Sequence, residues 1–139
     1  MELDTVMTAN PATCRADTPL RHVATIMLEN DCGMIPVVDE QGAPMGVVTD
    51  RDIAVRAVAG GKDISRCSAG DYMTSPVRSV PMDTSLADVC AAMESAQVRR
   101  MPVVDGDGRL CGVVAQADIA LNGNRERTAE VVREVSKPC

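Results

Sequence analysis

The chain has 139 residues, 45% of them hydrophobic and 24% charged, so it can form one compact domain or two very small ones, and wholesale disorder is excluded. It contains no Trp, no Phe and one Tyr, so bases cannot stack on aromatic platforms, and its formal net charge of −6 disfavours nucleic acid or an anionic membrane as partner. The N-terminus lacks the features of a signal peptide and no apolar run is long enough to span a bilayer, so we expect a cytoplasmic protein without a membrane partner.

The cysteines are scattered along the chain, at positions 14, 32, 67, 90, 111 and 139. None of them forms a Cys-x-x-Cys pair, and the single histidine is His22. This spacing gives no support to a metal site, and without a secretory signal a disulfide framework is not expected. We predict reduced thiols that mostly fill space in the core.

The chain contains an internal duplication. When the sequence is shifted by 66 residues, residues 7–55 align with residues 73–121 without a gap, and 18 of the 49 positions are identical. The shared motifs are Met-Thr at 7–8 and 73–74, Pro-Val-Val-Asp at 36–39 and 102–105, and Gly-Val-Val at 46–48 and 112–114. Ungapped agreement of this density predicts a tandem repeat.

The first copy is predicted to begin with a short extended piece at residues 13–15. Thr18 is expected to cap a helix in which Pro19 takes the first position, and apolar residues at helical spacing carry this helix to about residue 30. The remaining elements are a strand at 34–38, a turn at 39–42, a strand at 45–48 and a helix from Thr49 to about residue 58. Each copy is therefore a β-α-β-β-α unit.

The second copy repeats this order, after a linker near residues 59–70 that contains two consecutive glycines. Its predicted elements are a helix at 86–96, strands at 101–104 and 110–114, a helix from about residue 116, and a further helix at 126–135. The predicted domains are residues 1–62 and 63–124, followed by a C-terminal helix or tail at 125–139. The fold class is α/β, with the duplicated units packed around a pseudo-two-fold axis that creates two equivalent clefts for a ligand.

The motifs of each copy resemble the cystathionine-β-synthase (CBS) domain. The resemblance lies in Met-Thr, in Pro-Val-Val-Asp after the first helix, and in Gly-Val-Val-Thr-Asp-Arg-Asp-Ile at 46–53, and it covers about residues 7–123. Two such domains in tandem form a Bateman module. The resemblance implies a stand-alone regulatory sensor that needs no cofactor and binds AMP, ADP, ATP or S-adenosylmethionine between its domains. It also implies a homodimer that acts on a separate, unknown effector protein.

Thr49 and Asp52 are the first predicted ligand-binding pair. They follow a buried strand and open a helix, where free backbone N–H groups and the helix dipole gather. A carboxylate at this place can accept hydrogen bonds from the two hydroxyls of a ribose. The same Thr-x-x-Asp spacing is also close to a capping box, which is a purely structural alternative. In the second copy Asp118 remains but Ala115 replaces the threonine, which favours a separate use for the aspartate as the ribose-binding residue of the family.

Arg99 and Arg100 precede the strand at 101–104. In the family, basic residues here bind the phosphates of a nucleotide whose ribose lies on the aspartate of the other domain. Arginine suits this task because its planar guanidinium can contact two phosphate oxygens at once. Strand alternation indicates that only one of the two faces the cleft centre, and a solvated surface pair is the alternative.

The pseudo-equivalent cleft is predicted to be weaker. It would use Asp118, with Met34 in an uncharged segment and Arg51 as a possible phosphate contact or a solvated helix residue. Family position also indicates apolar linings for the adenine. These are Val47, Pro76, Val77, Arg78, Val98, Met101 and Pro102 in the first cleft, and Pro11, Ala12, Thr13, Met34, Ile35, Pro36 and Val113 in the second.

Three other functions are open to this sequence. Catalysis is disfavoured because no nucleophile lies in a recognisable motif and His22 lies beside the apolar stripe of its helix. A protein-interaction module without a ligand would not require Thr49, Asp52 and the two arginines together. A metal or redox sensor would require clustered cysteines.

Overall fold

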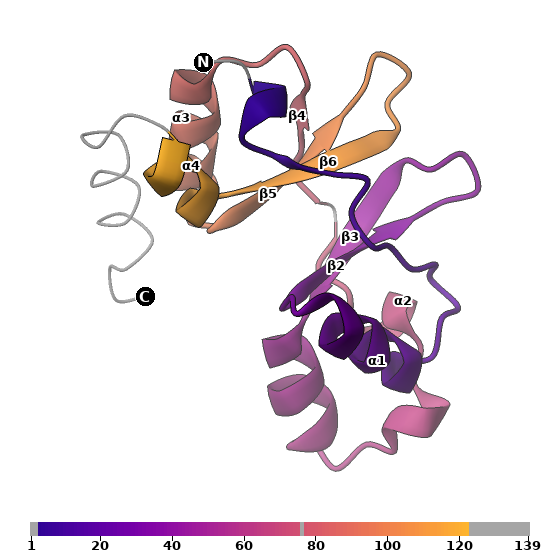
Figure 1. The fold of residues 1–139 in the computed structure, drawn as a ribbon. Coiled ribbons are helices and arrows are strands. Elements are labelled where there is room, and N and C mark those ends of the chain that lie inside the picture. Colours follow the sequence, from indigo (N-terminus) through magenta and orange to yellow (C-terminus); the bar gives the residue numbers. More distant parts are fainter. Residues whose placement is uncertain (1–2, 76, 123–139) are drawn as a thin grey trace. The chain divides into compact units, whose positions relative to one another are not determined.

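The computed structural model describes residues 3–75 and 77–122, and its chain divides into two compact units (Figure 1). We call Ala12–Val77 the first-repeat unit, and Met1–Pro11 together with Arg78–Cys139 the second-repeat unit. This division does not follow the domain boundaries predicted from the repeat, because each unit includes a short segment from the other copy. The predicted helix at 126–135 lies outside the described residues.

The first-repeat unit is a two-stranded antiparallel hairpin flanked by helices (Figure 1). Its elements are α1 (Leu20–Asn30), β2 (Met34–Val38), β3 (Pro44–Thr49), η2 (Asp52–Val58), η3 (Ile64–Arg66) and α2 (Ala69–Tyr72). The predicted extended piece at 13–15 is confirmed by a parallel bridge between Cys14 and Val37. The elements predicted for the first copy are thus present in the predicted order.

The second-repeat unit holds a four-stranded sheet in the order β1-β6-β5-β4. Its elements are η1 (Leu3–Thr5), β1 (Thr8–Ala9), β4 (Val80–Pro81), α3 (Leu86–Ala96), β5 (Arg100–Val104), β6 (Leu110–Ala115) and α4 (Gln116–Asn122). β1 and β5 are antiparallel to β6, whereas β4 is parallel to β5. The mixed α/β fold is as predicted.

The two hairpins repeat each other residue by residue. Met34 pairs with Thr49 and Arg100 with Ala115, and the register shifts at Val37/Val38 in one hairpin and at Val103/Val104 in the other. In both turns the aspartate of Pro-Val-Val-Asp accepts two backbone N–H bonds, and the turn glycine has a φ of 84° or 80°. A positive φ is strained for other residues, so the repeated Asp and Gly define the turn.

The helix caps differ between the copies. Ser85 caps α3, and its hydroxyl accepts the Asp88 N–H at 3.1 Å. The prediction that Thr18 caps α1 is wrong, because the cap residue is Pro19, the sequence equivalent of Ser85, which has no side-chain acceptor. The Thr18 hydroxyl instead accepts the Arg15 N–H at 2.9 Å.

The helix predicted from Thr49 to residue 58 is present, but its Asp52–Val58 part is a π-helix. The Ala59 N–H binds the Ala54 carbonyl, five residues earlier, at 2.9 Å. Apolar periodicity does not separate this wider turn from an α-helix, so the sequence could not indicate it.

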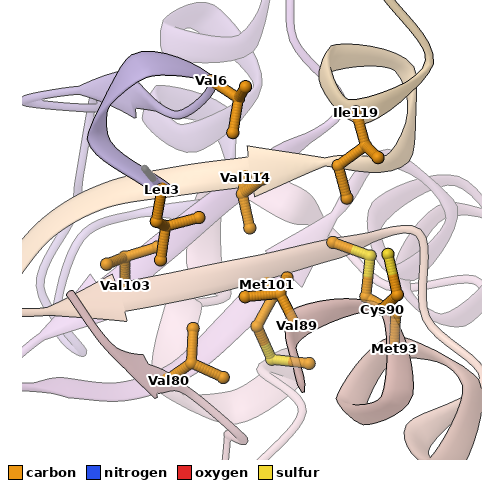
Figure 2. Close-up of a cluster of buried hydrophobic side chains, with 10 residues drawn as sticks. All are labelled: Leu3, Val6, Val80, Val89, Cys90, Met93, Met101, Val103, Val114 and Ile119. Carbon is orange, nitrogen blue, oxygen red and sulfur yellow. The ribbon is translucent and has the colours of Figure 1, made fainter. Parts of the chain in front are cut away.

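Each unit has its own aliphatic core. In the second-repeat unit, Leu3 of η1 and Val6, which follows η1, pack against the sheet beside Val103 and Val114 (Figure 2). The first-repeat core is built by α1, β2, β3 and η2, together with Ala69 of α2. Residues from outside the repeated hairpins therefore complete both cores.

A close backbone approach fixes the outer edge of each hairpin. The Thr74 N–H and carbonyl bind the Val47 carbonyl and N–H at 2.8 and 3.1 Å, and β1 places Thr8 opposite Val113 in the same way. A Cβ on Gly46 would lie 2.7 Å from the Thr74 carbonyl oxygen, and one on Gly112 would lie 3.0 Å from that of Thr8. Side chains crowd the same space, since the Cβ would also lie 2.9 Å from the Met73 sulfur at Gly46 and 2.5 Å from the Met7 sulfur at Gly112. Glycine therefore suits both positions.

We predict that Gly46→Ala lowers the free energy of unfolding by about 1–3 kcal/mol, the usual effect of forcing extra volume into a packed site. Gly112→Ala should act in the same direction. Gly106→Ala is the matched control, because a Cβ there meets no atom within 4 Å. Urea unfolding of the three variants checks this, and equal stability of Gly46→Ala and Gly106→Ala would contradict it.

The buried cysteine of the first-repeat unit is Cys14. It is 5% exposed, and burial raises the pKa of its thiol from the ordinary value of 9.0 to about 11. Cys14, Cys32, Cys67 and Cys111 are free thiols. The prediction that cysteines fill space in the core is confirmed for Cys14.

Iodoacetamide at pH 8 should therefore label Cys14 much more slowly than the half-buried Cys67, and quickly only after denaturation. Because the folded thiol keeps its proton above the pKa of the unfolded chain, this group's contribution to stability falls as the pH rises from about 9 to 11. Peptide mass spectrometry reports the labelling. Equal labelling of the two thiols in the folded protein would show that Cys14 is accessible.

Candidate functional site

The junction between β3 and the following helix holds Asp52 in a reciprocal pair of hydrogen bonds. The Thr49 hydroxyl accepts the Asp52 N–H at 3.1 Å, and Asp52 Oδ2 accepts the Thr49 N–H at 3.0 Å. The capping-box alternative is therefore correct as a description of the local structure. It explains why a carboxylate on a side chain that is only 12% exposed is stable at this place.

The other oxygen of the same carboxylate faces an arginine. Arg56 Nη1 lies 3.4 Å from Asp52 Oδ1, and it also donates to the Tyr72 carbonyl at 2.9 Å. The guanidinium carbon is 5.6 Å from the centre of the Tyr72 ring, within cation–π range. Sequence reasoning missed Arg56, although its i,i+4 spacing from Asp52 is a usable signal for an ion pair.

The carboxylate of Asp52 retains capacity for a ligand. An ionised carboxylate has about four acceptor positions, two on each oxygen. Thr49 uses one position on Oδ2 and Arg56 one on Oδ1. The arrangement can therefore accept two further donors, one on each oxygen, which matches a pair of neighbouring hydroxyls.

The equivalent junction of the second-repeat unit repeats the backbone bond to its aspartate. Asp118 Oδ2 accepts the Ala115 N–H at 3.2 Å. Ala115 offers no hydroxyl for the reciprocal bond, but its backbone N–H still donates to the aspartate, so the replacement of threonine does not by itself assign Asp118 a separate use. Four residues after Asp118 the sequence has Asn122, where the first copy has Arg56.

Arg99 and Arg100 lie at the start of β5, and both are exposed. The Arg99 carbonyl accepts the Gln116 N–H at 2.9 Å, so the arginines border the junction that holds Asp118. At the equivalent place in the first copy, a Cβ on Gly33 would lie 2.9 Å from Asp50 Oδ2. That site has no room for an arginine without movement of Asp50.

The predicted apolar linings fall into two groups. Val47, Val77, Val98 and Met34 are half-buried, and Pro102 is buried. Met101 and Ile35 are members of the two cores, at 1% and 0% exposure, so their side chains are committed to packing. Pro76 lies outside the described residues.

The predicted site residues belong to different units. The first-repeat unit holds Met34, Val47, Thr49, Arg51, Asp52 and Val77, and the second-repeat unit holds Val98, Arg99, Arg100, Pro102 and Asp118. Arg51 is exposed on the helix that begins at Asp50.

Metal ligands do not gather in the described part of the chain. No group of three or more His, Cys, Asp or Glu side chains among residues 3–75 and 77–122 could hold a metal ion. In the same residues, no helix combines the length and the apolar character that crossing a bilayer requires.

Comparison with known proteins identifies the repeat. The family model of the CBS domain matches residues 3–58 and again residues 69–122. The CBS domain-containing protein YhcV of Bacillus subtilis is 38% identical over 116 residues, which are 84% of this chain and 81% of YhcV.

Two solved structures agree in fold. Hypoxic Response Protein I, crystallised with two coordinated zinc ions, is 31% identical with a TM-score of 0.81, over 89% of this chain and 100% of that one. The CBS domain pair of protein MJ0100, in complex with 5′-methylthioadenosine and S-adenosyl-L-methionine, is 26% identical with a TM-score of 0.77, over 87% and 98%. Two family matches, a curated relative and the shared fold agree: the chain belongs to the CBS domain family and carries two CBS domains in tandem.

Proposed function

We propose that the chain is a regulatory module that binds an adenosine ligand, AMP, ADP or ATP, with the ribose on Asp52. The observation that carries the proposal is the buried Asp52 carboxylate, fixed at a helix start with an acceptor position left on each oxygen. The MJ0100 domain pair, which has the same fold, is in complex with two ligands that contain a modified adenosine. Both ligands carry the vicinal ribose diol, whose two hydroxyls could donate hydrogen bonds to this carboxylate.

Phosphates would be bound by Arg99 and Arg100. Both side chains are exposed at the start of β5, and neither forms a salt bridge with a described acidic residue. Their positive charges complement a phosphate, and a guanidinium can bind two of its oxygens. In the proposed cleft they lie opposite Thr49 and Asp52, and Val47, Val77, Val98 and Pro102 line the adenine.

A second, weaker site is proposed around Asp118, with Met34 and Arg51. It lacks the arginine pair, because Gly33 and Met34 stand where the second copy has Arg99 and Arg100. Asp118 is also less buried than Asp52. Such a site favours adenosine without phosphates, or remains empty.

S-adenosylmethionine is the second candidate ligand, because the MJ0100 pair is in complex with it. Its sulfonium is positively charged, so the arginine pair disfavours it relative to AMP. We propose no catalytic role for the chain. Its effect on a separate effector protein remains a prediction from the family resemblance, and its location in the cytoplasm a prediction from the sequence. A ligand-free interaction module is the alternative function.

Calorimetry with AMP and adenosine tests this function. Asp52→Ala should weaken both ligands by about 1.5–3 kcal/mol, the range for a hydrogen bond to a charged group. Arg99→Ala and Arg100→Ala should weaken AMP selectively, and added salt should reduce their effect. Asp118→Ala should cost less than Asp52→Ala. Arg109→Ala, an exposed arginine in the turn of the same unit, is the matched control and should change neither ligand.

Because Asp52 also caps a helix, Asp52→Asn serves as a second variant that keeps an acceptor for the Thr49 N–H, and thermal unfolding verifies that both variants fold. Absence of AMP binding by the parent protein at millimolar ligand would contradict the proposed function. Equal losses from Asp52→Ala and Asp118→Ala would show that the two sites are ranked wrongly.

We also expect a symmetric homodimer, because large apolar side chains remain exposed on the single chain. Leu28 is 82% exposed, and Val55 and Val58 are 48% and 54% exposed. Such surface favours association. Light scattering should give twice the mass of the chain, and a monomer at every accessible concentration would contradict this.

A further inference from the structure

The carboxylate of Asp52 is held at both of its oxygens, by two different kinds of donor. The Thr49 N–H fixes Oδ2 at 3.0 Å, and Arg56 Nη1 lies 3.4 Å from Oδ1. The backbone bond alone would leave the plane of the carboxylate free to rotate about that contact. We propose that Arg56 is a positioning residue that sets the plane of the Asp52 carboxylate for the ribose diol, an inference that rests on the proposed function.

Arg56 can do this because it is itself anchored. Its Nη1 donates to the Tyr72 carbonyl at 2.9 Å, and its guanidinium lies 5.6 Å from the centre of the Tyr72 ring. Tyr72 packs against the core of the first-repeat unit. The half-exposed arginine is therefore tied to a fixed point on α2 as well as to the carboxylate.

The requirement for this geometry comes from the ligand. Two neighbouring hydroxyls need one acceptor on each carboxylate oxygen at the same time, and a rotated carboxylate offers only one. A half-exposed i,i+4 ion pair contributes little to folding stability. Loss of Arg56 should therefore disturb recognition of the diol far more than it disturbs the fold.

The second copy does not repeat this residue. Position 122, four residues after Asp118, is an asparagine and carries no charge. An arginine four residues after the aspartate is therefore a feature of the Asp52 site and not of the Asp118 site. Preference for the ribose diol should depend on Arg56, and no residue of the other repeat should substitute for it.

Direct binding of a phosphate is the rival role for a half-exposed arginine. The two roles differ in the ligand they affect. A positioning residue is needed for adenosine and AMP alike, because both carry the diol. A phosphate-binding residue is needed for AMP and has no effect on adenosine.

The experiment measures dissociation constants of adenosine, AMP and 2′,3′-dideoxyadenosine, which lacks both hydroxyls. The parent protein should bind adenosine at least about tenfold more tightly than the dideoxy compound, as expected for hydrogen bonds to a charged acceptor. Arg56→Gln should bring this ratio close to one, weaken AMP as much as adenosine, and leave the dideoxy compound nearly unchanged. Arg56→Lys, which keeps the charge without the planar fork, should restore part of the ratio.

Two controls accompany these variants. Arg66→Gln removes the same charge from an exposed arginine of the same unit, and Tyr72→Phe keeps the ring and the carbonyl that hold Arg56. Both should keep the parent ratio.

Four outcomes would overturn the inference. An unchanged ratio in Arg56→Gln would remove any role for Arg56 in diol recognition, while the proposed function would stand. If Arg56→Gln weakened the binding of adenosine and of the dideoxy compound equally, the role of Arg56 would be merely structural. If the variant weakened only AMP binding, Arg56 would contact the phosphate. A parent protein that does not distinguish adenosine from the dideoxy compound would overturn the ribose contact of the proposed function, and the role of Arg56 with it.

Discussion

The arrangement of each unit depends on a backbone contact that only glycine allows. Gly46 lets Thr74 pair with Val47, and Gly112 lets Thr8 pair with Val113. Strands β3 and β6 are thereby held between two neighbours, so their ends are fixed. The helices that carry Asp52 and Asp118 start directly at those ends. The position of each carboxylate therefore follows from a contact made several residues earlier on the strand.

Much of this architecture could be predicted from the repeat, because turns, bulges and apolar stripes are local properties. The pairing of each Met-Thr segment with the hairpin of the other copy could not be predicted. Residues 7–8 and 73–74 are identical, and identity shows which residues are equivalent but not which strand each one joins. The cap at Pro19 was missed for a related reason: Thr18 is the better capping residue by type, but the position is set by the contacts around it, including the Leu20 N–H bond to the Cys67 carbonyl.

At the candidate site, the structural and the functional interpretations of Thr-x-x-Asp are compatible. The carboxylate of Asp52 closes the turn and still has an acceptor position on each oxygen. Comparison of Thr49 with Ala115 could not separate the two interpretations, because the decisive bond is made by the backbone N–H. The copies differ instead at Arg56, whose importance becomes visible only when the Tyr72 carbonyl and ring are placed beside it.

A crystal structure of the protein with AMP tests the central claim most directly. It should show both ribose hydroxyls within hydrogen-bond distance of the Asp52 carboxylate, one on each oxygen, with the phosphate beside Arg99 or Arg100. A nucleotide whose ribose lies on Asp118 alone, or away from both carboxylates, would contradict the account.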